Sequence, residues 1–492
     1  MTDARPPIAD GAADLVGAVR ASPPFDALPV DRAEEVAKAT RVERFPAGTT
    51  ILRQGGEPST ALYVIRSGHV EIREGGRLVD QPGAGEVFGE LSLLSGAPPT
   101  ATVVAGDELV CLAVGGDVAR QVLGTAGGVA FVQASLRRGV LRSLDQETRS
   151  LADAIESADQ QEAAVAVARG IPELACVLVD DGADSVKIGH VIGASIDALT
   201  RRLIALAIDD LGEPPVPWAW MALGSEARLE QALHTDQDHA LAYDLGDLPV
   251  EEVDPYFAQL AELVTAGLEA AGIPRCNGDA MAITPGLRRS VESWATAFHD
   301  WMSDAGLEGS IFSSITFDHR RVSGPLDIEP TLHGVIATAA ERYPDFLRHL
   351  AHRALDRKPP TGFIRNFVVE SKGEHAGRLD VKHGGVTIIA NLARFYAIRE
   401  GRPEKSTLDR LRAAEETGQI NNEDRLALEE AFRLLWQIRL EHQVRQVRVD
   451  TEPDDFVDPA ELGPIARLGL KEAFRIIGKE QQGLATEIGA RY

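Results

Sequence analysis

The chain has 492 residues, of which 44% are hydrophobic, and a formal net charge of −25. This length and hydrophobic content suit about three domains with cores of their own and exclude a chain that is disordered throughout. The negative charge would repel a polyanion, so we expect no nucleic-acid partner. Three cysteines, Cys111, Cys176 and Cys276, are too far apart for a zinc site or a disulfide framework.

Neither a signal peptide nor a membrane span is visible in the sequence. The first residues lack an apolar segment after a basic start, and no window approaches the roughly 18 uninterrupted apolar residues that a membrane span needs. We therefore expect a cytoplasmic protein with no membrane partner.

Residues 1–21 have no clear periodicity, and we expect them to form a tail. In residues 22–125, short β-type runs alternate with glycines; these runs are residues 49–52, 61–66, 69–73, 101–104 and 109–113. The pattern predicts a small antiparallel jelly roll.

This block also resembles a cyclic-nucleotide-binding domain, through residues 45–49, 54–55, 62–68 and 87–94. The resemblance implies that Glu90 corresponds to the ribose-binding glutamate, whereas Pro99 stands where such domains carry a phosphate-binding arginine. A charge-assisted contact to phosphate contributes about 1.5–3 kcal/mol, so its loss lowers affinity about 10- to 150-fold. We expect a degenerate module that regulates or docks, with cyclic-nucleotide binding as the less favoured alternative.

Residues 126–212 have apolar residues at three- and four-residue spacing and are expected to form a helical connector. Residues 213–330 then form a domain of mixed pattern. Residues 218–223 suit a buried strand, residues 226–233 suit a helical turn or two, and residues 238–243 suit a second strand. The short turn between the first strand and the helix is Gly224-Ser225.

Two features of this domain carry complementary chemistry. A Gly-Ser turn at the start of a helix offers free backbone N–H groups to an anion, the usual way of holding phosphates. Asp236 and Asp238 lie two residues apart, so on a strand their carboxylates share one face with Cα atoms about 6.5–7 Å apart and can bind one Mg²⁺. The pair can also be solvated turn residues. Together, the two features predict a site for a metal-bridged nucleoside triphosphate (NTP).

The string from Gly224 to Asp238 resembles the motif of the DNA polymerase beta-like nucleotidyltransferases. More narrowly, it resembles the DUF294-type enzymes related to PII uridylyltransferase and glutamine-synthetase adenylyltransferase. The resemblance implies a third carboxylate on a later strand, for which Asp318 is the candidate. Arg228 and Gln231 could face the triphosphate, or Arg228 could belong to the charged surface.

Residues 331–492 are predicted to be helical, with an interruption at residues 359–362. Residues 363–366, 379–385 and 439–443 resemble the substrate-binding domain that follows the transferase in this family. Such a bundle closes over the nucleotide, and Lys382 could then reach the triphosphate or could be a solvated loop lysine. The whole chain is thus expected to be a multidomain α+β protein: jelly roll, helical linker, polymerase beta-like α/β core and C-terminal helix bundle.

The leading hypothesis is an enzyme that uses Mg²⁺ or Mn²⁺ to move NMP from an NTP to a hydroxyl of a PII-like protein or a small molecule. Asp236, Asp238 and Asp318 would hold the metal and catalyse transfer, and Gly224, Ser225, Arg228, Gln231 and Lys382 would bind the nucleotide. The rival is a non-catalytic signalling protein that binds a nucleotide and reports it. The N-terminal barrel or the helix after it could also hold a homodimer.

Overall fold

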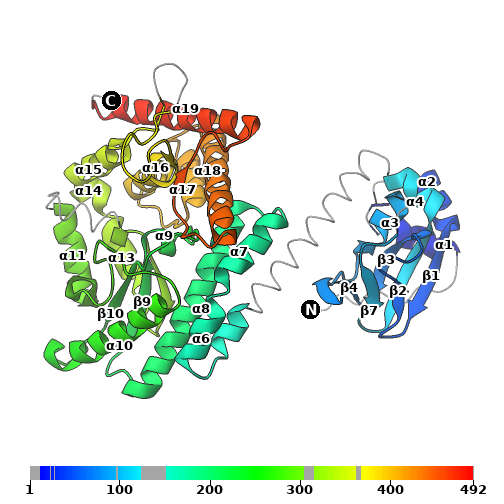
Figure 1. The fold of residues 1–492 in the computed structure, drawn as a ribbon, viewed down its shortest axis with the longest axis horizontal. Helices are drawn as coiled ribbons and strands as arrows, with labels where there is room; N and C mark the ends of the chain where they lie inside the picture. The colour runs from blue at the N-terminus through cyan, green and yellow to red at the C-terminus, as the bar shows by residue number, and fades with distance from the viewer. Residues whose placement is uncertain are drawn as a thin grey trace. The chain divides into compact units, whose positions relative to one another are not determined.

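The structure, a computed structural model, describes residues 12–20, 22, 24–26, 28–95, 98–123, 151–303, 315–361 and 367–490. The chain divides into two compact units, Met1–Glu147 and Thr148–Tyr492 (Figure 1). The predicted fold class, a multidomain α+β protein with an N-terminal β domain followed by a mixed core and C-terminal helices, is confirmed. Among the described helices, none has both the length and the hydropathy that a membrane crossing requires.

The first unit is a sandwich of two four-stranded sheets. One sheet has the order β1 (Thr40–Phe45), β8 (Leu109–Gly115), β3 (Ala61–Ser67), β6 (Val87–Phe88). The other has the order β2 (Thr50–Leu52), β7 (Thr102–Ala105), β4 (Val70–Glu74), β5 (Arg77–Asp80). The five strands expected from the sequence are β2, β3, β4, β7 and β8, and the structure adds β1, β5 and β6.

Four helices flank these sheets: α1 (Ala12–Arg20), α2 (Val30–Lys38), α3 (Glu90–Ser95) and α4 (Gly116–Leu123). Part of the segment that we expected to be a tail forms α1. Its Ala18 and Val19 are buried in a core that also contains Phe25, Val36 and Leu62. This end of the chain therefore belongs to the hydrophobic core of the first unit.

The second unit contains a four-stranded sheet of order β11–β10–β9–β12. Its strands are β9 (Trp218–Leu223), β10 (His239–Tyr243), β11 (Arg288–Ser290) and β12 (His319–Ser323). β9 runs antiparallel to both β10 and β12, whereas β10 and β11 are parallel. All residues of β9 and β10 are buried, in agreement with their uninterrupted apolar sequences.

Helices surround this sheet. Before β9 come α6 (Gln161–Ala168), α7 (Ile171–Asp180) and α8 (Ser185–Leu211), and between the strands come α10 (Val250–Ala270) and α11 (Val291–Ser303). α8 contacts the sheet through an ion pair of Asp197 with Arg320 at 2.7 Å, and Ser185 donates to the Arg433 carbonyl of a C-terminal helix at 3.2 Å. The end of the expected connector is thus packed into the second unit.

After β12, the described part of the chain forms α13 (Glu329–Ile336), α14 (Ala339–Arg342), α15 (Pro344–Leu355), α16 (Thr387–Arg399), α17 (Thr407–Glu416), α18 (Asn422–Arg448) and α19 (Pro464–Glu487). Lys382–Val386 forms one π-helical turn before α16, and β13 (Leu379–Asp380) pairs with β14 (Phe456–Val457). Figure 1 shows α15 to α19 grouped in the same unit as the sheet. The buried Phe395, Phe432, Trp436 and Phe474 contribute to the core of these helices.

Candidate active site

The Gly224-Ser225 turn follows β9 directly and opens α9 (Gly224–Ala227). Gly224 has a φ of +54°, a left-handed conformation that a residue with a Cβ adopts at a cost. A Cβ at this position would also lie 3.2 Å from Oδ2 of Asp238. Position 224 therefore requires glycine for two reasons: the left-handed conformation of the turn and the close approach of the Asp238 carboxylate.

α9 is a single turn, shorter than the helix expected over residues 226–233. Leu229 takes a φ of +55° directly after the turn, which stops a right-handed helix. The N–H groups of Leu229 and Glu230 are bonded to the carbonyls of Glu226 and Ser225, at 3.1 and 2.9 Å. The chain then leaves α9 without a further helical turn.

Asp236 and Asp238 converge just before β10. One oxygen of each carboxylate and Sγ of Cys276 all lie within 4.8 Å of one another. Leu223 donates its N–H to the Asp238 carbonyl at 2.8 Å, so the pair lies beside the end of β9 and the Gly224 turn. The carboxylates and the turn that the sequence suggested for metal and phosphate are thus neighbours.

The electrostatics of this cluster favour a cation. Burial, together with the carboxylate of Asp236, raises the pKa of Asp238 to about 7, against the effects of Cys276, Lys382 and Arg228. Two carboxylates and a thiol are good ligands for a divalent ion, and the missing Cβ of Gly224 leaves space beside Asp238. The residues present therefore fit a divalent metal ion.

Lys382 brings positive charge from the C-terminal helices to this cluster. It opens the π-helical turn, lowers the pKa of Asp238, and its Nζ lies 3.8 Å from Oδ2 of Asp455. Asp455 is itself ion-paired with Arg439, at 2.5 Å. Lys382 is thus half-buried and interacts with two acidic groups, and its contact with a triphosphate stays a prediction.

Asp318 was expected to be the third carboxylate of the metal site, but it lies outside the cluster of Asp236, Asp238 and Cys276. Its side chain is fully buried and forms ion pairs with Arg228, Arg394 (2.6 Å) and Arg410 (2.6 Å). Burial alone would raise the pKa of Asp318, but these guanidinium groups hold it well below its usual range. Both carboxylate oxygens face arginines, so Asp318 anchors an ionic cluster that we call the arginine cluster: Asp318, Arg228, Arg394 and Arg410.

Arg228 and Gln231, the other expected nucleotide contacts, differ in their surroundings: Arg228 is ion-paired within the protein, whereas the amide of Gln231 is buried without a hydrogen-bond partner. Arg228 donates to Glu230 at 2.6 Å and to Asp318. Burial would lower the pKa of Arg228, but these two carboxylates raise it above its usual value. Gln231 is buried, and its Oε1 lies 2.9 Å from where a Cβ of Gly193 on α8 would be. Gln231 thus packs against α8.

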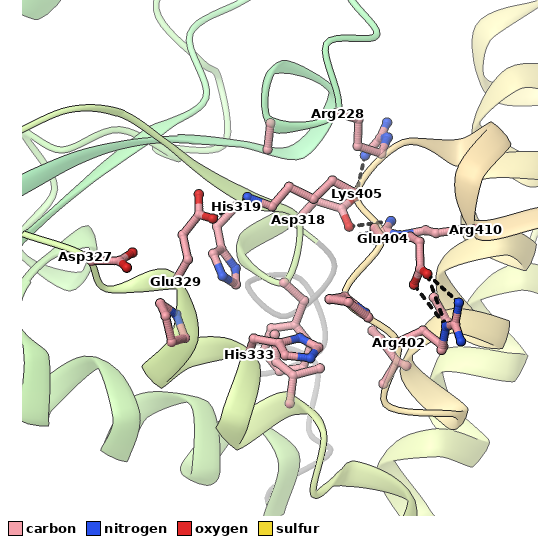
Figure 2. A pocket seen from close by; sticks show the side chains of 17 residues that line it. Arg228, Asp318, His319, Asp327, Glu329, His333, Arg402, Glu404, Lys405 and Arg410 are labelled. Atoms are coloured by element: carbon pink, nitrogen blue, oxygen red, sulfur yellow. Dashed lines mark hydrogen bonds and ion pairs between the residues drawn. The ribbon is translucent and has the colours of Figure 1, made fainter. Parts of the chain in front are cut away.

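A cavity of about 400 Å³ lies beside the arginine cluster (Figure 2). Arg228, Asp318 and Arg410 line one part of it; other lining residues include His319, Glu329, His333 and Lys405. Lys405 contacts Glu329 at 2.5 Å, and Arg402 contacts Glu404 at 2.7 Å, so much of the charge is paired within the protein. Neither Asp236 nor Asp238 lines this cavity.

Sequence reasoning did not identify Cys276, Arg394 or Arg410 as parts of the site. Cys276 lies between the acidic pair and Asp318 in the sequence, and nothing in its spacing indicates a ligand. Arg394 and Arg410 lie at otherwise apolar helix positions, and both are buried. A charged residue on the apolar face of a predicted helix indicates a buried ion pair, and this signal could have identified both arginines.

In the first unit, Glu90 begins α3 directly after Gly89, whose φ is +86°. Burial raises the pKa of Glu90 above its usual value. Pro99 is buried, and its carbonyl accepts a hydrogen bond from the N–H of Gly55 at 2.8 Å. The position expected for a phosphate-binding arginine therefore has no charged side chain.

Three family models match the chain. Residues 42–126 match the cyclic nucleotide-binding domain. Residues 169–308 match the family described as "Putative nucleotidyltransferase DUF294", and residues 344–488 match the "Putative nucleotidyltransferase substrate binding domain". The transferase match begins within the expected connector, ahead of α8, which packs on the sheet.

Curated relatives match over part of the chain. A cGMP-dependent protein kinase of Toxoplasma gondii is 32% identical over 107 residues, which are 22% of this chain and 11% of the kinase. A cAMP-dependent protein kinase regulatory subunit of Dictyostelium discoideum is 36% identical over 137 residues, which are 26% of this chain and 42% of the subunit. The chain thus spans between about a tenth and less than half of the length of these relatives.

Solved structures match over a similar share of the chain. The regulatory domain of Toxoplasma gondii PKA with cAMP is 24% identical and has a TM-score of 0.23, covering 25% of this chain and 49% of that one. A regulatory subunit of a cAMP-independent protein kinase A from Trypanosoma cruzi, bound to guanosine, is 28% identical with a TM-score of 0.22, covering 24% of this chain and 43% of that one. By its family matches, the chain carries a cyclic nucleotide-binding domain, a DUF294-type nucleotidyltransferase domain and the substrate-binding domain of that family.

Proposed function

We propose that this protein transfers NMP from an NTP to a hydroxyl group, on a protein or on a small molecule, with the help of Mg²⁺ or Mn²⁺. The observation that carries this proposal is the convergence of Asp236 and Asp238 beside the Gly224 turn, with Lys382 facing the same cluster. Carboxylates, free N–H groups and a lysine are the groups that a metal-bridged triphosphate needs.

Each group has a separate task. The N–H groups of α9 that follow Gly224 bind phosphate oxygens, because the Gly224 N–H is already bonded to the Asp318 carbonyl, and Lys382 neutralises a further negative charge. Asp236 and Asp238 hold the divalent ion, which neutralises charge on the reacting phosphate. The C-terminal helices cover this edge of the sheet and exclude water, since Lys382, Arg394 and Arg410 come from that part of the chain.

Asp318 has a different task in this proposal from the one expected from the sequence. A carboxylate with both oxygens on guanidinium groups is a poor base, because its pKa is held low. Asp318 instead fixes the position of Gly224, whose N–H donates to the Asp318 carbonyl at 2.9 Å. We therefore assign it to positioning the phosphate-binding turn.

The acceptor, the location, the regulation and the oligomeric state of the protein are also proposals. A net charge of −25 disfavours nucleic acid as the acceptor. A cytoplasmic location, a PII-like protein acceptor and control of transfer by the N-terminal domain are consistent with the domain composition. A homodimer through the N-terminal unit is a further proposal.

The test is the transfer of label from each α-labelled NTP, with Mg²⁺ or Mn²⁺, into the proteins and small molecules of a native lysate. Wild type is compared with the Asp236→Asn/Asp238→Asn double variant. Asp244→Asn is the matched control, because Asp244 follows the opposite end of β10. Label that depends on the acidic pair and survives in the control is the expected result.

Other outcomes distinguish the alternatives. NTP binding that depends on the acidic pair, without transfer to any lysate component, would support the rival function of nucleotide sensing. Absence of both NTP binding and transfer would contradict the proposed function. Equal labelling by wild type and the double variant would show that the acidic pair is not the catalytic site.

A further inference from the structure

The acidic pair has a third neighbour that is not a carboxylate. Sγ of Cys276 lies within 4.8 Å of a ligand oxygen of both Asp236 and Asp238, and the thiol interacts with the Asp238 side chain. Among the described residues, this is the one group of three or more acidic, histidine or cysteine side chains whose geometry could hold a metal ion. The site thus combines two hard oxygen ligands with one soft sulfur ligand.

Main-chain bonds fix Cys276 against the acidic pair. Gln237, between the two aspartates, donates its N–H to the Pro274 carbonyl at 3.0 Å and forms a parallel bridge with Arg275. His239 donates its N–H to the Ala280 carbonyl at 2.9 Å. The Gln237 side chain also donates to the Ile273 carbonyl at 2.8 Å. The segment that carries the cysteine is therefore bonded to the segment that carries both carboxylates.

The turn around Cys276 places two backbone donors at its sulfur. The backbone N–H groups of Gly278 and Ala280 both hydrogen-bond to its side chain. This geometry requires Asp279 to adopt a φ of +55°, and Asp279 is held there by bonds to Cys276 and Thr284. Burial and the carboxylates of Asp238 and Asp236 raise the pKa of the Cys276 thiol to about 12, while the two N–H groups act in the opposite direction. Cys276 is therefore a candidate ligand because its sulfur lies beside both carboxylates, where a divalent ion would take the place of the thiol proton.

The carboxylate that would otherwise complete a three-oxygen site is engaged elsewhere. Asp318 is bound by the arginine cluster, and its main chain lies on the β12 side of Gly224, whereas Asp238 lies on the β10 side. Cys276 is left beside the acidic pair as the third protein ligand. Three protein ligands leave open positions for a substrate oxygen, as catalytic metal sites require.

We propose that Cys276 is the third protein ligand of the metal ion at Asp236 and Asp238, and that the site prefers a transition-metal ion such as Mn²⁺, Co²⁺ or Zn²⁺ to Mg²⁺. Thiolate ligands suit these ions, whereas Mg²⁺ takes oxygen ligands. On binding, the metal–sulfur bond replaces the S–H bond, and the proton leaves to the buffer. The catalytic part of this inference rests on the proposed function, but the ligand set does not.

The ligand set is tested by adding Co²⁺ to the full-length protein without NTP, under a phosphine reductant. Sulfur bound to Co²⁺ gives a charge-transfer absorption band in the near ultraviolet, and equilibrium dialysis measures the bound ion separately. We expect the band in the wild type and in Cys176→Ser, a matched control because Cys176 is also half-buried. We expect it to vanish in Cys276→Ser and in the Asp236→Asn/Asp238→Asn variant.

The affinity for Co²⁺ should fall by about tenfold or more in Cys276→Ser, because even the loss of an outer-shell partner costs about 10- to 100-fold. Transfer gives a second readout: Cys276→Asp, with three oxygen ligands, should shift the preference from Mn²⁺ towards Mg²⁺. A Co²⁺ ion that binds at the acidic pair without the band, or a band that survives in Cys276→Ser, would overturn the inference and leave the proposed function intact. Absence of metal binding with or without NTP would contradict both.

Discussion

Gly224 is the residue on which the phosphate turn and the acidic pair both depend. A Gly224→Ala variant would place a methyl group 3.2 Å from Oδ2 of Asp238 and force alanine to a φ of +54°. Gly246 is a matched control, since it has a φ of +53° with nothing within 4 Å of its Cβ position. We expect both variants to lose roughly 1–2 kcal/mol of stability through the backbone.

Only Gly224→Ala should lose function. Displacement of Asp238 and of the α9 N–H groups should lower transfer on the order of 100-fold, as small misplacements in active sites do. Label transfer at saturating NTP and urea unfolding measure the two effects separately. Equal activity of the Gly224→Ala and Gly246→Ala variants would show that the close approach of Asp238 to Gly224 is not needed for transfer.

Asp318 should contribute mainly to stability. Asp318→Asn would leave the buried guanidinium groups of Arg394 and Arg410 without their carboxylate and Arg228 with Glu230 alone, and loss of one partner of a buried ion pair costs about 3–5 kcal/mol. Asp345→Asn is the control, because its pair with Arg348 is exposed and should contribute less than about 1 kcal/mol. Urea unfolding followed by tryptophan fluorescence reports on the second unit alone, since all five tryptophans lie there.

The same pair of variants gives a pH dependence with a definite sign. The pKa of Asp318 is lowered in the folded protein, so its stabilising contribution is present above the ordinary aspartate pKa of about 3.9 and is lost as the pH falls towards the lower folded value. The stability difference between wild type and Asp318→Asn should therefore shrink below about pH 4. A difference that stays constant with pH would contradict the charged arginine cluster.

At the scale of single elements, α8 supports the site from behind. A Cβ at Gly193 of α8 would lie 2.9 Å from both Gln231 Oε1 and Leu229 Cδ2, in the segment that follows α9. Gly193→Ala should cost about 1–3 kcal/mol through overpacking and lower transfer several-fold. Gly483→Ala in α19 has nothing within 4 Å and should instead stabilise the protein by roughly 0.5–1 kcal/mol through helix propensity. Thermal unfolding and label transfer of both variants check this contrast.

The elements that sequence reasoning located correctly are those with a local signal. β9 and β10 were placed to within one residue, because two uninterrupted apolar runs flank a Gly-Ser turn. The length of α9 was overestimated, because no sequence signal marks Leu229 as a left-handed residue. In the first unit, β6 has only two residues and was not identified.

The parts of the site that sequence reasoning did not place depend on contacts between distant segments. Asp318 was expected on a later strand and lies directly before β12. The orientation of its side chain, however, is set by Arg394 on α16 and Arg410 on α17. Lys382 was located near the acidic pair only by resemblance. The local sequence pattern therefore located the candidate charged residues. Which of them form ion pairs depends on the packing of distant segments.

At the scale of the whole molecule, the N-terminal unit should be a weak receptor for cyclic nucleotides. Pro99→Arg restores a phosphate contact worth about 1.5–3 kcal/mol, so cAMP affinity measured by calorimetry should rise about 10- to 150-fold. The bond from Gly55 uses the main-chain carbonyl of Pro99 and can persist in the variant. Adding Glu90→Gln should reverse the gain.

Regulation can be tested with the same variant. If the N-terminal unit controls transfer, cAMP should change the transfer rate of Pro99→Arg and leave that of the wild type unchanged. The far-ultraviolet circular dichroism of the variant checks that it folds. Tight cAMP binding by the wild type would contradict the interpretation of this unit as degenerate, and binding by Pro99→Arg without a change in rate would separate binding from control.

The position of β12 has a practical consequence for how this protein can be divided. The transferase match ends at residue 308 and the substrate-binding match begins at residue 344, so neither includes Asp318 or β12. A recombinant fragment cut at residue 308 would expose one edge of β9 and leave Arg228 with Glu230 but without Asp318. A fragment starting at residue 344 would carry Arg394 and Arg410 with no counterion from the sheet. Expressed separately, the two pieces should aggregate or unfold, while a single piece from residue 148 onward keeps every partner of the arginine cluster.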